Sequence, residues 1–456
     1  MAIELSSLTF TEQDDVVPAS GEEQIFNSGI TNTLAGNDII NGTDFSSSNI
    51  GLENYYEGVI NTGDGDDTLI GDSYWNNGIV NSGTINTGVG KDKIIAYGGI
   101  YNFNAIETGA DDDEITARSS GPGIGNEGII DTGDGHDIIT GTAWAELDPR
   151  FPFFSNGGIS NRRSDSIIDT GNDNDTITGT GDLSIDNSGS INTGNGEDFI
   201  FSEGKFINSG SINTDNSEDS ILSEGEFINS GSINTGNGAD FMDCEGEFIN
   251  SGSLNTGNGA DSIGLGIYVI NYGGVFLGEG DDFLSASSSF AYDYSIENFN
   301  FIGTGDGNDT IISGNVIHNQ GVIETGNGND SITVYGLLYS IDNNGGTINM
   351  GDGNDSIITS AGFKSAPNSS GSVFLGDGED YINGFGSGDF YGGNGFDTLG
   401  LTPGTYTVGI WGEGGESRIF TKDNQLMITS EFERLIAGGT TYDFASLTAG
   451  QIITIA

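Results

Sequence analysis

The chain is poor in cysteine, proline, histidine and basic residues, and each shortage excludes a class of protein. A single cysteine, Cys244, among 456 residues excludes a disulfide framework and a cysteine-based zinc cluster. Six prolines exclude collagen. The only histidines are His136 and His318, which makes a zinc site improbable. No apolar run is long enough for a transmembrane helix, so no membrane span is expected.

Basic residues are so few that the charge balance is extreme. Eleven Lys and Arg face 68 Asp and Glu, which leaves a formal net charge of −57. Nucleic acid and anionic membranes would repel such a chain, so neither is an expected partner. Cations are the simplest partner. The N-terminus, MAIELSS, has no basic segment followed by an apolar one, so no cleavable export signal is expected.

What the chain does contain is one motif, repeated. Glycine accounts for 78 residues, and 26 Phe and 15 Tyr make a disordered chain improbable. Variants of T-G-x-G-x-D recur, as in TGDGDDTLI (62–70), TGNGEDFIF (193–201) and TGDGNDTII (304–312). Each of the sixteen copies ends in one aspartate, which we call its key aspartate: Asp38, Asp67, Asp92, Asp113, Asp137, Asp175, Asp198, Asp219, Asp240, Asp261, Asp282, Asp309, Asp330, Asp355, Asp380 and Asp397.

The spacing of the key aspartates predicts a solenoid. Their base period is 21 residues, interrupted by insertions, and fixed periods of this length are typical of stacked repeats. The residue two after each key aspartate is always apolar, and the residue seven before it is apolar except at Thr31. Many residues thirteen before it are apolar as well, so each coil offers three short strands. We therefore expect an all-β, parallel, right-handed β-solenoid (a β-roll or β-helix) of about sixteen coils.

The ends of the chain lack the repeat. We expect an N-terminal cap over 1–24, solenoid repeats over 25–399 and a C-terminal β cap over 400–456. Strand-like stretches within the C-terminal cap are Tyr406–Trp411, Gln425–Ile428 and Gln451–Ile455.

Two further positions of the repeat predict hydrogen-bonded ladders. Asn stands eleven residues before the key aspartate in twelve of sixteen copies, and Thr stands five before it in twelve. When coils stack, such side chains align from one coil to the next. We expect the Asn file at a corner of the coil and the Thr file beside the glycine loop.

The motif also has the chemistry of a calcium site. Calcium takes six to eight oxygens from carboxylates and carbonyls, and glycine lets the backbone turn its carbonyls toward one point. One loop supplies too few oxygens, so the ions would lie between stacked loops, with the key aspartates as ligands. Magnesium fits less well because it demands tight octahedral geometry. The candidate loop glycines are Gly63, Gly65, Gly194, Gly196, Gly236, Gly238, Gly257, Gly259, Gly278, Gly280, Gly305, Gly307, Gly326, Gly328, Gly351, Gly353, Gly376, Gly378, Gly393 and Gly395.

The tract GGNGFDTL (392–399) and the copies before it resemble the calcium-binding nonapeptide of RTX (hemolysin-type) proteins, G-G-x-G-x-D-x-U-x. The resemblance covers about 38–399. It implies calcium bound between coils, folding coupled to calcium, and export with an uncleaved C-terminal signal. This chain departs from the family because the motif occurs once per 21 residues rather than twice per 18. We therefore expect one file of calcium ions, and a coil whose cross-section is more triangular than that of the RTX family.

Three loops depart from the motif. Asp111 and Asp173 replace the second glycine of their loops, while Asp215 and Ser217 replace both glycines of another. Because residues with a Cβ adopt positive φ at a cost, we expect weaker sites around 109–113, 171–175 and 214–219. The first loop, where Leu34 replaces a glycine, is treated as sound.

Two insertions interrupt the period. The one at 142–165 gathers aromatic residues and three of the eleven basic residues, so it is a candidate docking surface for a glycan or a protein, or an ordinary packed excursion. A second insertion near 45–56 is acidic and aromatic.

These patterns favour a non-enzymatic, secreted calcium-binding protein with a structural, cell-surface or adhesive role. A polysaccharide-acting enzyme is an alternative on the same scaffold, but a catalytic site is normally unique and these carboxylates repeat. An ice-binding protein is another, although its surface would need a uniform file of Thr or Asn. Extracellular calcium modules bind at about 10⁻⁴–10⁻³ M, which predicts folding outside the cell.

Overall fold

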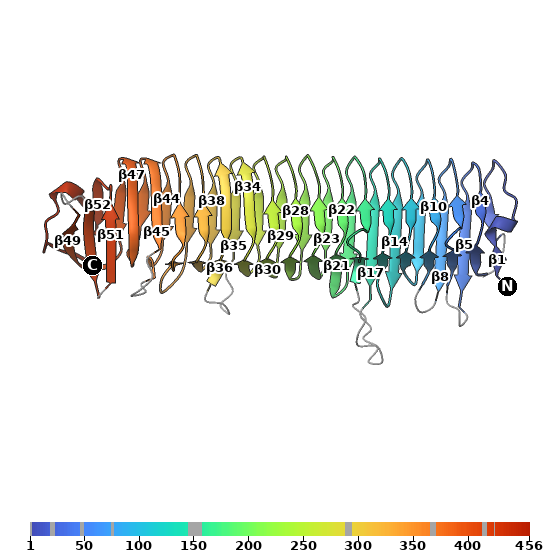
Figure 1. Cartoon of the computed structure of the whole chain (residues 1–456), viewed down its shortest axis with the longest axis horizontal. Helices are drawn as coiled ribbons and strands as arrows, with labels where there is room; N and C mark the ends of the chain where they lie inside the picture. Colours follow the sequence, from blue (N-terminus) through green and yellow to red (C-terminus); the bar gives the residue numbers. More distant parts are fainter. Residues whose placement is uncertain are drawn as a thin grey trace. The chain divides into compact units, whose positions relative to one another are not determined.

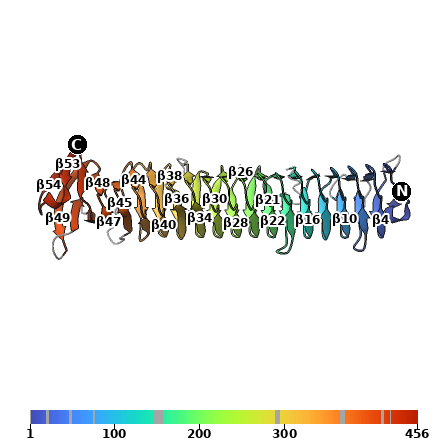
Figure 2. The ribbon, with the colours of Figure 1, turned by 90° about the horizontal axis from the view of Figure 1, so that it is seen from above.

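A computed structural model describes residues 2–18, 23–45, 50–73, 77–144, 157–287, 294–364, 371–412, 417–423 and 425–456. The described chain is all-β, with strands paired mainly in parallel and only two short 3₁₀ helices. It is a parallel β-solenoid, as the repeat predicts. The chain divides into two compact units, residues 1–237 and 238–456. Figure 1 shows the strands of each unit as repeated layers, and Figure 2 shows the same layers from above.

Each turn of the solenoid has three sides. The strands of the first side end in the Asn file, and we call this side the amide sheet. The strands of the second side lead into the glycine loop and form the entry sheet. The strands of the third side follow the key aspartate and form the exit sheet. In one representative turn these are β9 (Ile79–Asn81), β10 (Thr84–Asn86) and β11 (Lys93–Tyr97). Each strand pairs in parallel with its counterparts one turn away.

In the first unit the three sheets are built from strands of two to six residues. The amide sheet also contains β1 (Ile3–Glu4), β3 (Ile25–Asn27), β6 (Leu52–Asn54), β12 (Ile100–Asn102), β15 (Ile124–Asn126), β18 (Gly157–Asn161), β21 (Leu183–Asn187), β24 (Lys205–Asn208) and β27 (Phe227–Asn229). The entry sheet also contains β4 (Ile30–Asn32), β7 (Val59–Asn61), β13 (Ala105–Glu107), β16 (Ile129–Asp131), β19 (Ile167–Asp169), β22 (Ser190–Asn192), β25 (Ser211–Asn213) and β28 (Ser232–Asn234). The exit sheet also contains β2 (Val16–Val17), β5 (Ile39–Asp44), β8 (Thr68–Ser73), β14 (Glu114–Ser119), β17 (Ile138–Ala143), β20 (Thr176–Thr180), β23 (Phe199–Ser202) and β26 (Ser220–Ser223).

The second unit repeats this arrangement and then loses one side. Its amide sheet contains β30 (Glu247–Asn250), β33 (Tyr268–Asn271), β36 (Tyr294–Asn298), β39 (Val316–Asn319) and β42 (Ile341–Asn343). Its entry sheet contains β31 (Ser253–Asn255), β34 (Gly274–Glu279), β37 (Phe301–Asp306), β40 (Val322–Glu324), β43 (Thr347–Asn349), β45 (Ser372–Gly378) and β47 (Gly388–Gly395). Its exit sheet contains β29 (Phe241–Cys244), β32 (Ser262–Leu265), β35 (Phe283–Ala286), β38 (Thr310–Ser313), β41 (Ser331–Val334), β44 (Ser356–Thr359), β46 (Tyr381–Asn383) and β48 (Thr398–Leu401).

The described residues make about 14 turns, slightly fewer than the sixteen coils expected. The difference arises at the end of the second unit, where the amide sheet stops at β42. Phe363 forms only an isolated bridge to Ile341, and the short stretch from Asp380 to Asp397 contains only β46 and β47. The 17 residues from Asp380 to Asp397 must supply an exit strand, an entry strand and a glycine loop, which leaves no length for a strand of the amide sheet.

The core is a set of aliphatic files inside each unit. Residues two after the key aspartates, such as Ile94 and Ile311, are 2% exposed or less, as are those seven before, such as Ile85 and Ile302. The alternation of strand side chains predicts this inward placement, and the structure confirms it. Both files consist mainly of Ile, whose branched side chain packs well on a pleated surface.

A non-repeating segment lies at one end of each unit, the N-terminal end of the first and the C-terminal end of the second. In the first, η1 (Leu5–Ser7) places the fully buried Leu5 beneath the first turn, and β1 and β2 pair with β3 and β5. In the second, the C-terminal segment forms β49 (Gly404–Trp411), β50 (Ser417–Lys422), β51 (Gln425–Ser430), β52 (Arg434–Ala437), β53 (Thr440–Asp443), η2 (Phe444–Ser446) and β54 (Ile452–Ile455). Of the three strand-like stretches expected there, Tyr406–Trp411 and Gln425–Ile428 lie within β49 and β51, and Gln451–Ile455 begins one residue before β54.

Candidate metal centre: a column of buried aspartates

The glycine loop is shaped by two residues with positive φ. In the loop before Asp67, Gly63 has φ 102° and Gly65 has φ 141°, a region that residues with a Cβ rarely adopt. Space is a second constraint. A Cβ on Gly65 would lie 2.0 Å from the carbonyl oxygen of Gly36 in the preceding loop. Glycine is therefore needed both for the turn and for the close stacking of loops.

The same close approach shows where the loop carbonyls point. A Cβ on Gly328 would lie 1.5 Å from the carbonyl oxygen of Gly307, and one on Gly353 would lie 1.5 Å from that of Gly328. The second glycine of each of these loops thus directs its carbonyl oxygen at the next loop along the stack. Carbonyl oxygens therefore line the gaps between loops.

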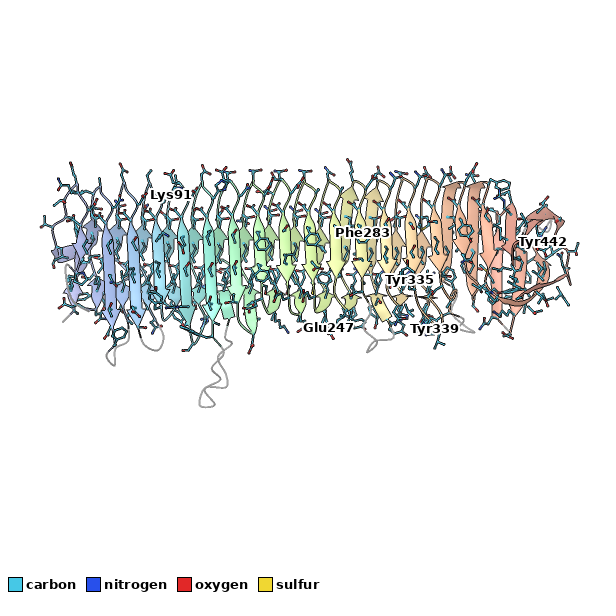
Figure 3. The ribbon with its side chains drawn as sticks, turned by 180° about the vertical axis from the view of Figure 1, so that it is seen from behind. Lys91, Glu247, Phe283, Tyr335, Tyr339 and Tyr442 are labelled. Carbon is cyan, nitrogen blue, oxygen red and sulfur yellow. The ribbon has the colours of Figure 1, made fainter. Side chains whose placement is uncertain are left out.

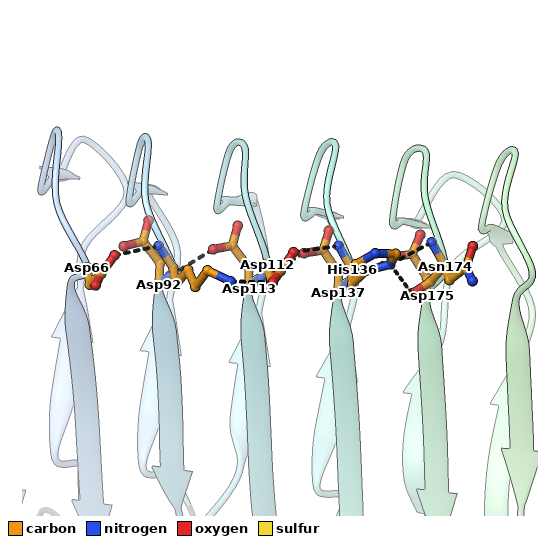
Figure 4. A network of polar contacts seen from close by, with 9 residues as sticks. Asp66, Asp92, Asp112, Asp113, His136, Asp137, Asn174 and Asp175 are labelled. Atoms are coloured by element: carbon orange, nitrogen blue, oxygen red, sulfur yellow. Dashed lines mark hydrogen bonds and ion pairs between the residues drawn. The ribbon is translucent and has the colours of Figure 1, made fainter.

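The key aspartates lie on the inside of the turn, where the loop becomes the exit strand. All sixteen are 3% exposed or less. In each unit they form a column in which the backbone N–H of one key aspartate donates to Oδ1 of the next. Figure 4 shows this at Asp92, Asp113, Asp137 and Asp175, where each donor–acceptor distance is 2.8 Å. The same bond runs through the second unit, as from Asp309 to Asp330 at 2.8 Å.

The other carboxylate oxygen has no such partner. Within the described residues Oδ2 is buried without a hydrogen bond in Asp38, Asp67, Asp92, Asp113, Asp137, Asp175, Asp198, Asp261, Asp282, Asp309, Asp330, Asp355, Asp380 and Asp397. The nearby threonine hydroxyl does not relieve this at Asp67, because Thr62 donates its only proton to the carbonyl of Thr87 at 2.9 Å. A buried carboxylate oxygen without a partner is costly, and a repeated one demands a common explanation.

Burial also changes the acidity of the column. Removal from water is the largest cause of a raised pKa at Asp67, to about 6, at Asp113, to about 7, and at Asp175, to about 8. Neighbouring key aspartates raise the pKa further, while the backbone N–H received from the preceding turn lowers it. Without counter-charge, part of the column would hold protons at neutral pH.

These oxygens fit calcium. No group of three or more His, Cys, Asp or Glu side chains in the described residues could hold a metal, so the shell would have to come from backbone carbonyls and carboxylates. Calcium accepts such mixed oxygen sets, whereas zinc prefers nitrogen and sulfur. The residues that would hold each ion are a key aspartate, through Oδ2, and the glycine carbonyls of the adjoining loops.

The three loops expected to be weak keep the shape of the others. Asp111, Asp173, Asp215 and Ser217 all have positive φ, between 63° and 100°, so the backbone accepts strain rather than changing path. Asp92 and Asp137 still donate their backbone N–H to Oδ1 of Asp113 and Asp175. Lower calcium affinity at these loops stays a prediction. Leu34 has φ 85°, so the first loop carries the same kind of strain and belongs with them.

The predicted ladders are present, and the structure extends one of them. Nδ2 of Asn81 donates to Oδ1 of Asn102 at 2.8 Å, and the same bond recurs within each unit. Asn54 and Asn161 also belong to it, although counting eleven residues back from the key aspartate misses them. Extra residues between the amide and entry strands shift the count at these turns. The threonine file lies beside the loop, with Thr87 Oγ1 donating to the carbonyl of Thr108 at 3.1 Å.

Two acidic residues at the ends of the column were missed by sequence reasoning. Asp15 donates its backbone N–H to Oδ1 of Asp38 at 2.7 Å, and Glu433 accepts the backbone N–H of Asp397 through Oε2 at 2.7 Å. Neither follows a glycine loop. The signal that could have found them is an acidic residue two positions before a buried aliphatic one, here Val17 and Leu435.

The outer edge of the loops carries separate, exposed contacts. Lys91, which Figure 3 shows at the loop edge, forms an ion pair with Asp112 one turn away. The Asp112 carboxylate also accepts the backbone N–H of His136 at 3.2 Å (Figure 4). Exposed ion pairs of this kind add little stability. They show that the outward residues of the loop do not belong to the buried column.

The expected docking surface at 142–165 falls partly outside the described residues, which exclude 145–156. At its start, the Arg118 guanidinium lies 4.2 Å from the Tyr97 ring centroid and 5.3 Å from that of the half-exposed Trp144. At its end, Arg163 pairs with Asp165 at 3.1 Å. A glycan or protein partner there stays a prediction. The insertion near 45–56 is described except for 46–49, and its Tyr55 packs edge-on against Phe26.

One buried polar cluster lies apart from the column, on the outside of the amide sheet in the second unit. Asp342 accepts from Lys364 at 2.7 Å and lies 3.0 Å from Nδ1 of His318. The Tyr294 ring lies tilted against His318, with ring centroids 5.0 Å apart, and the Lys364 ammonium lies 4.9 Å from the ring centroid of Tyr339, which Figure 3 places away from the loop edge. The carboxylate and the ammonium of the cluster are paired with each other, so we interpret it as a packing contact.

Comparison with known proteins adds a distant likeness in fold. No family model and no curated protein matches the chain. Among solved structures, the crystal structure of a hyperactive, Ca2+-dependent, β-helical antifreeze protein from an Antarctic bacterium is similar at 20% identity, over 76% of this chain and 83% of that chain, with a TM-score of 0.33. A likeness this loose carries no argument about function. Among the described residues, no helix is long and apolar enough to cross a membrane.

Proposed function

We propose that the protein is a calcium-binding β-solenoid that folds on binding calcium and has a structural, cell-surface or adhesive role. The observation that carries the proposal is the file of buried Oδ2 atoms without hydrogen-bond partners in both units. A protein interior tolerates stacked carboxylates only when they are protonated or paired with cations. Calcium bound between loops supplies that positive charge.

Each part of the loop has a distinct task in this proposal. Oδ1 of the key aspartate is fixed by a backbone N–H from the preceding turn, as at Asp309, where Asp282 donates at 2.8 Å. That bond orients the carboxylate and leaves Oδ2 for the ion. The glycines aim carbonyl oxygens into the same gap. Hydrogen bonds and apolar contacts between turns stack them first. Stacking brings the carboxylates of neighbouring key aspartates close together, and the ion neutralises their charge.

We further propose that the protein works outside the cytoplasm. Sites with few charges, shared between loops, belong to the class of extracellular calcium modules that bind at about 10⁻⁴–10⁻³ M. At cytoplasmic calcium the column would remain charged and the turns would separate. In calcium-rich surroundings, binding energy becomes folding energy.

A calcium titration followed by native mass spectrometry tests the proposal. We expect many ions per chain at millimolar calcium and none in excess EGTA. Asp309→Asn should lower the number of bound ions, because it removes one buried charge while keeping the shape of the side chain. Asp306→Asn, which removes an exposed carboxylate of the same loop, is the matched control and should leave the number unchanged. A chain that binds no calcium at about 1 mM, the upper end of the range for extracellular modules, would falsify the proposed function.

A further inference from the structure

The C-terminal cap continues the aspartate column by one position. Strand β52 pairs in parallel with β48, with Arg434 opposite Thr398, so Glu433 occupies the place of the next key aspartate after Asp397. Accordingly, Asp397 donates its backbone N–H to Oε2 of Glu433 at 2.7 Å. The cap thus presents a carboxylate where every earlier turn presents an aspartate.

The cap also enters the last glycine loop. This loop has Gly392 at the position where twelve other loops have threonine. A Cβ on Gly392 would lie 1.9 Å from the carbonyl oxygen of Glu431 and 2.8 Å from Oδ2 of Asp397. The cap carbonyl therefore occupies the space that a threonine side chain takes elsewhere, beside the aspartate carboxylate.

Oδ2 of Asp397 and the carbonyl oxygen of Glu431 therefore converge beside Gly392, and both can only accept hydrogen bonds. Asp397 is fully buried and its Oδ2 has no hydrogen-bond partner in the described residues. Glu431 has φ 65°, so the chain accepts a left-handed conformation at a non-glycine residue where its carbonyl meets the loop. Acceptors that meet without a donor repel one another unless a proton or a cation lies between them.

We propose that the cap completes a terminal divalent-cation site, formed by Oδ2 of Asp397, the carbonyl oxygen of Glu431 and the carboxylate of Glu433. The proposal rests on the calcium-binding function above and adds a site closed by a segment without a glycine loop. Its consequence is that the last ion docks the cap on the solenoid. Calcium, which takes carboxylate and carbonyl oxygens together, is the ligand that fits.

Contacts independent of the ion hold this segment in register. The backbone N–H groups of Arg434 and Glu433 donate to the carbonyl of Asp397 at 3.0 and 3.2 Å. The Arg434 guanidinium lies 4.4 Å from the ring centroid of Phe396, an outward residue of the last loop. A variant at Glu433 should therefore keep the cap strands while changing the site.

The test compares Glu433→Gln with Glu431→Gln in the 456-residue chain. The amide introduced by Glu433→Gln can still accept the backbone N–H of Asp397 but lacks the charge. Glu431→Gln removes the same charge from an exposed side chain and keeps the backbone carbonyl, so it is the matched control. Bound calcium is counted by native mass spectrometry, and hydrogen exchange is followed over 430–437 with and without calcium.

We expect Glu433→Gln to bind one ion fewer than the unmodified chain and to lose the calcium-dependent protection of 430–437, with exchange about tenfold faster. Glu431→Gln should match the unmodified chain in both. Gly392→Thr, whose Cβ would collide with the Glu431 carbonyl, should lose the same ion without touching a charge. An unchanged count and unchanged protection in Glu433→Gln would overturn the terminal site, as would equal losses in both Gln variants. Failure of the unmodified chain to bind calcium would instead refute the function itself.

Discussion

Calcium removal and acidification should act on this protein in opposite directions. In excess EGTA at pH 8 the column of key aspartates is charged and uncompensated, so we expect the β-structure to be lost. Lowering the pH to 5 in the same EGTA should restore it, because protons then replace calcium as the neutralising partner. With calcium present at pH 8, the protein should be folded throughout.

The pKa values of the column give the size and the sign of the effect. Burial raises the pKa of Asp92 from 3.8 to about 7 and that of Asp175 to about 8. Such a carboxyl binds its proton more tightly in the folded chain, so its contribution to stability is complete below pH 3.8 and is lost as the pH rises through 7 or 8. At about 1.4 kcal/mol per pKa unit, one carboxyl of the Asp92 kind accounts for roughly 4 kcal/mol.

Coupling between neighbours makes the sum smaller than additive, since stacked carboxyls titrate as a group. Even so, a few such groups match the roughly 5–15 kcal/mol by which a typical domain is stable. The metal-free chain therefore has too little stability to keep the whole column ionised.

Circular dichroism and thermal unfolding at pH 5, 6, 7 and 8, each in EGTA and in calcium, provide the measurement. The midpoint in EGTA should fall steeply from pH 5 to 8, whereas the midpoint in calcium should change little or rise, because protons compete with calcium for the same oxygens. A midpoint in EGTA that stays constant, or rises with pH, would show that the buried carboxylates carry no uncompensated charge and would refute the reasoning.

Three further predictions concern single positions. Gly328→Ala should destabilise the calcium-loaded protein by about 2 kcal/mol or more in urea unfolding, because the added Cβ meets a backbone carbonyl. Gly345→Ala is the control, because Gly345 has a positive φ but open space around it, and it should cost only about 1 kcal/mol. Equal losses in the two variants would contradict the steric interpretation. Asp173→Gly should lower the calcium concentration at the folding midpoint, since it relieves a φ of 83°, and a higher midpoint would speak against strain. Asn208→Leu should cost about 2–4 kcal/mol in the same unfolding assay by leaving buried ladder partners unpaired, and a loss no larger than that of Asn195→Ala in the exposed loop file would count against the ladder.

The solenoid could be predicted because its signal repeats at a constant distance from each glycine loop. Ile94 and Ile85 lie inside as expected, since no insertion separates them from Asp92. The count failed where the distance varies. Asn54 and Asn161 join the amide ladder although extra residues separate them from the entry strand.

The candidate site was predicted only in part. The motif predicts that the key aspartates are oxygen ligands, but it does not reveal that Oδ1 is already engaged by the preceding turn. That bond depends on the register between turns, which a single repeat does not encode. Asp15 and Glu433 were missed for a related reason: neither follows a glycine loop, and each keeps only the carboxylate and the aliphatic residue two positions after it.

The hydrogen bonds of the aspartate column all run the same way along the chain, from the backbone N–H of one turn to the carboxylate of the turn that follows it in sequence. The column therefore has a polarity. A turn that is stacked without its successor has a backbone N–H that lacks its carboxylate acceptor. Each turn is complete only when the turn after it is in place, and the last key aspartate, Asp397, depends for this bond on the C-terminal segment that carries Glu433.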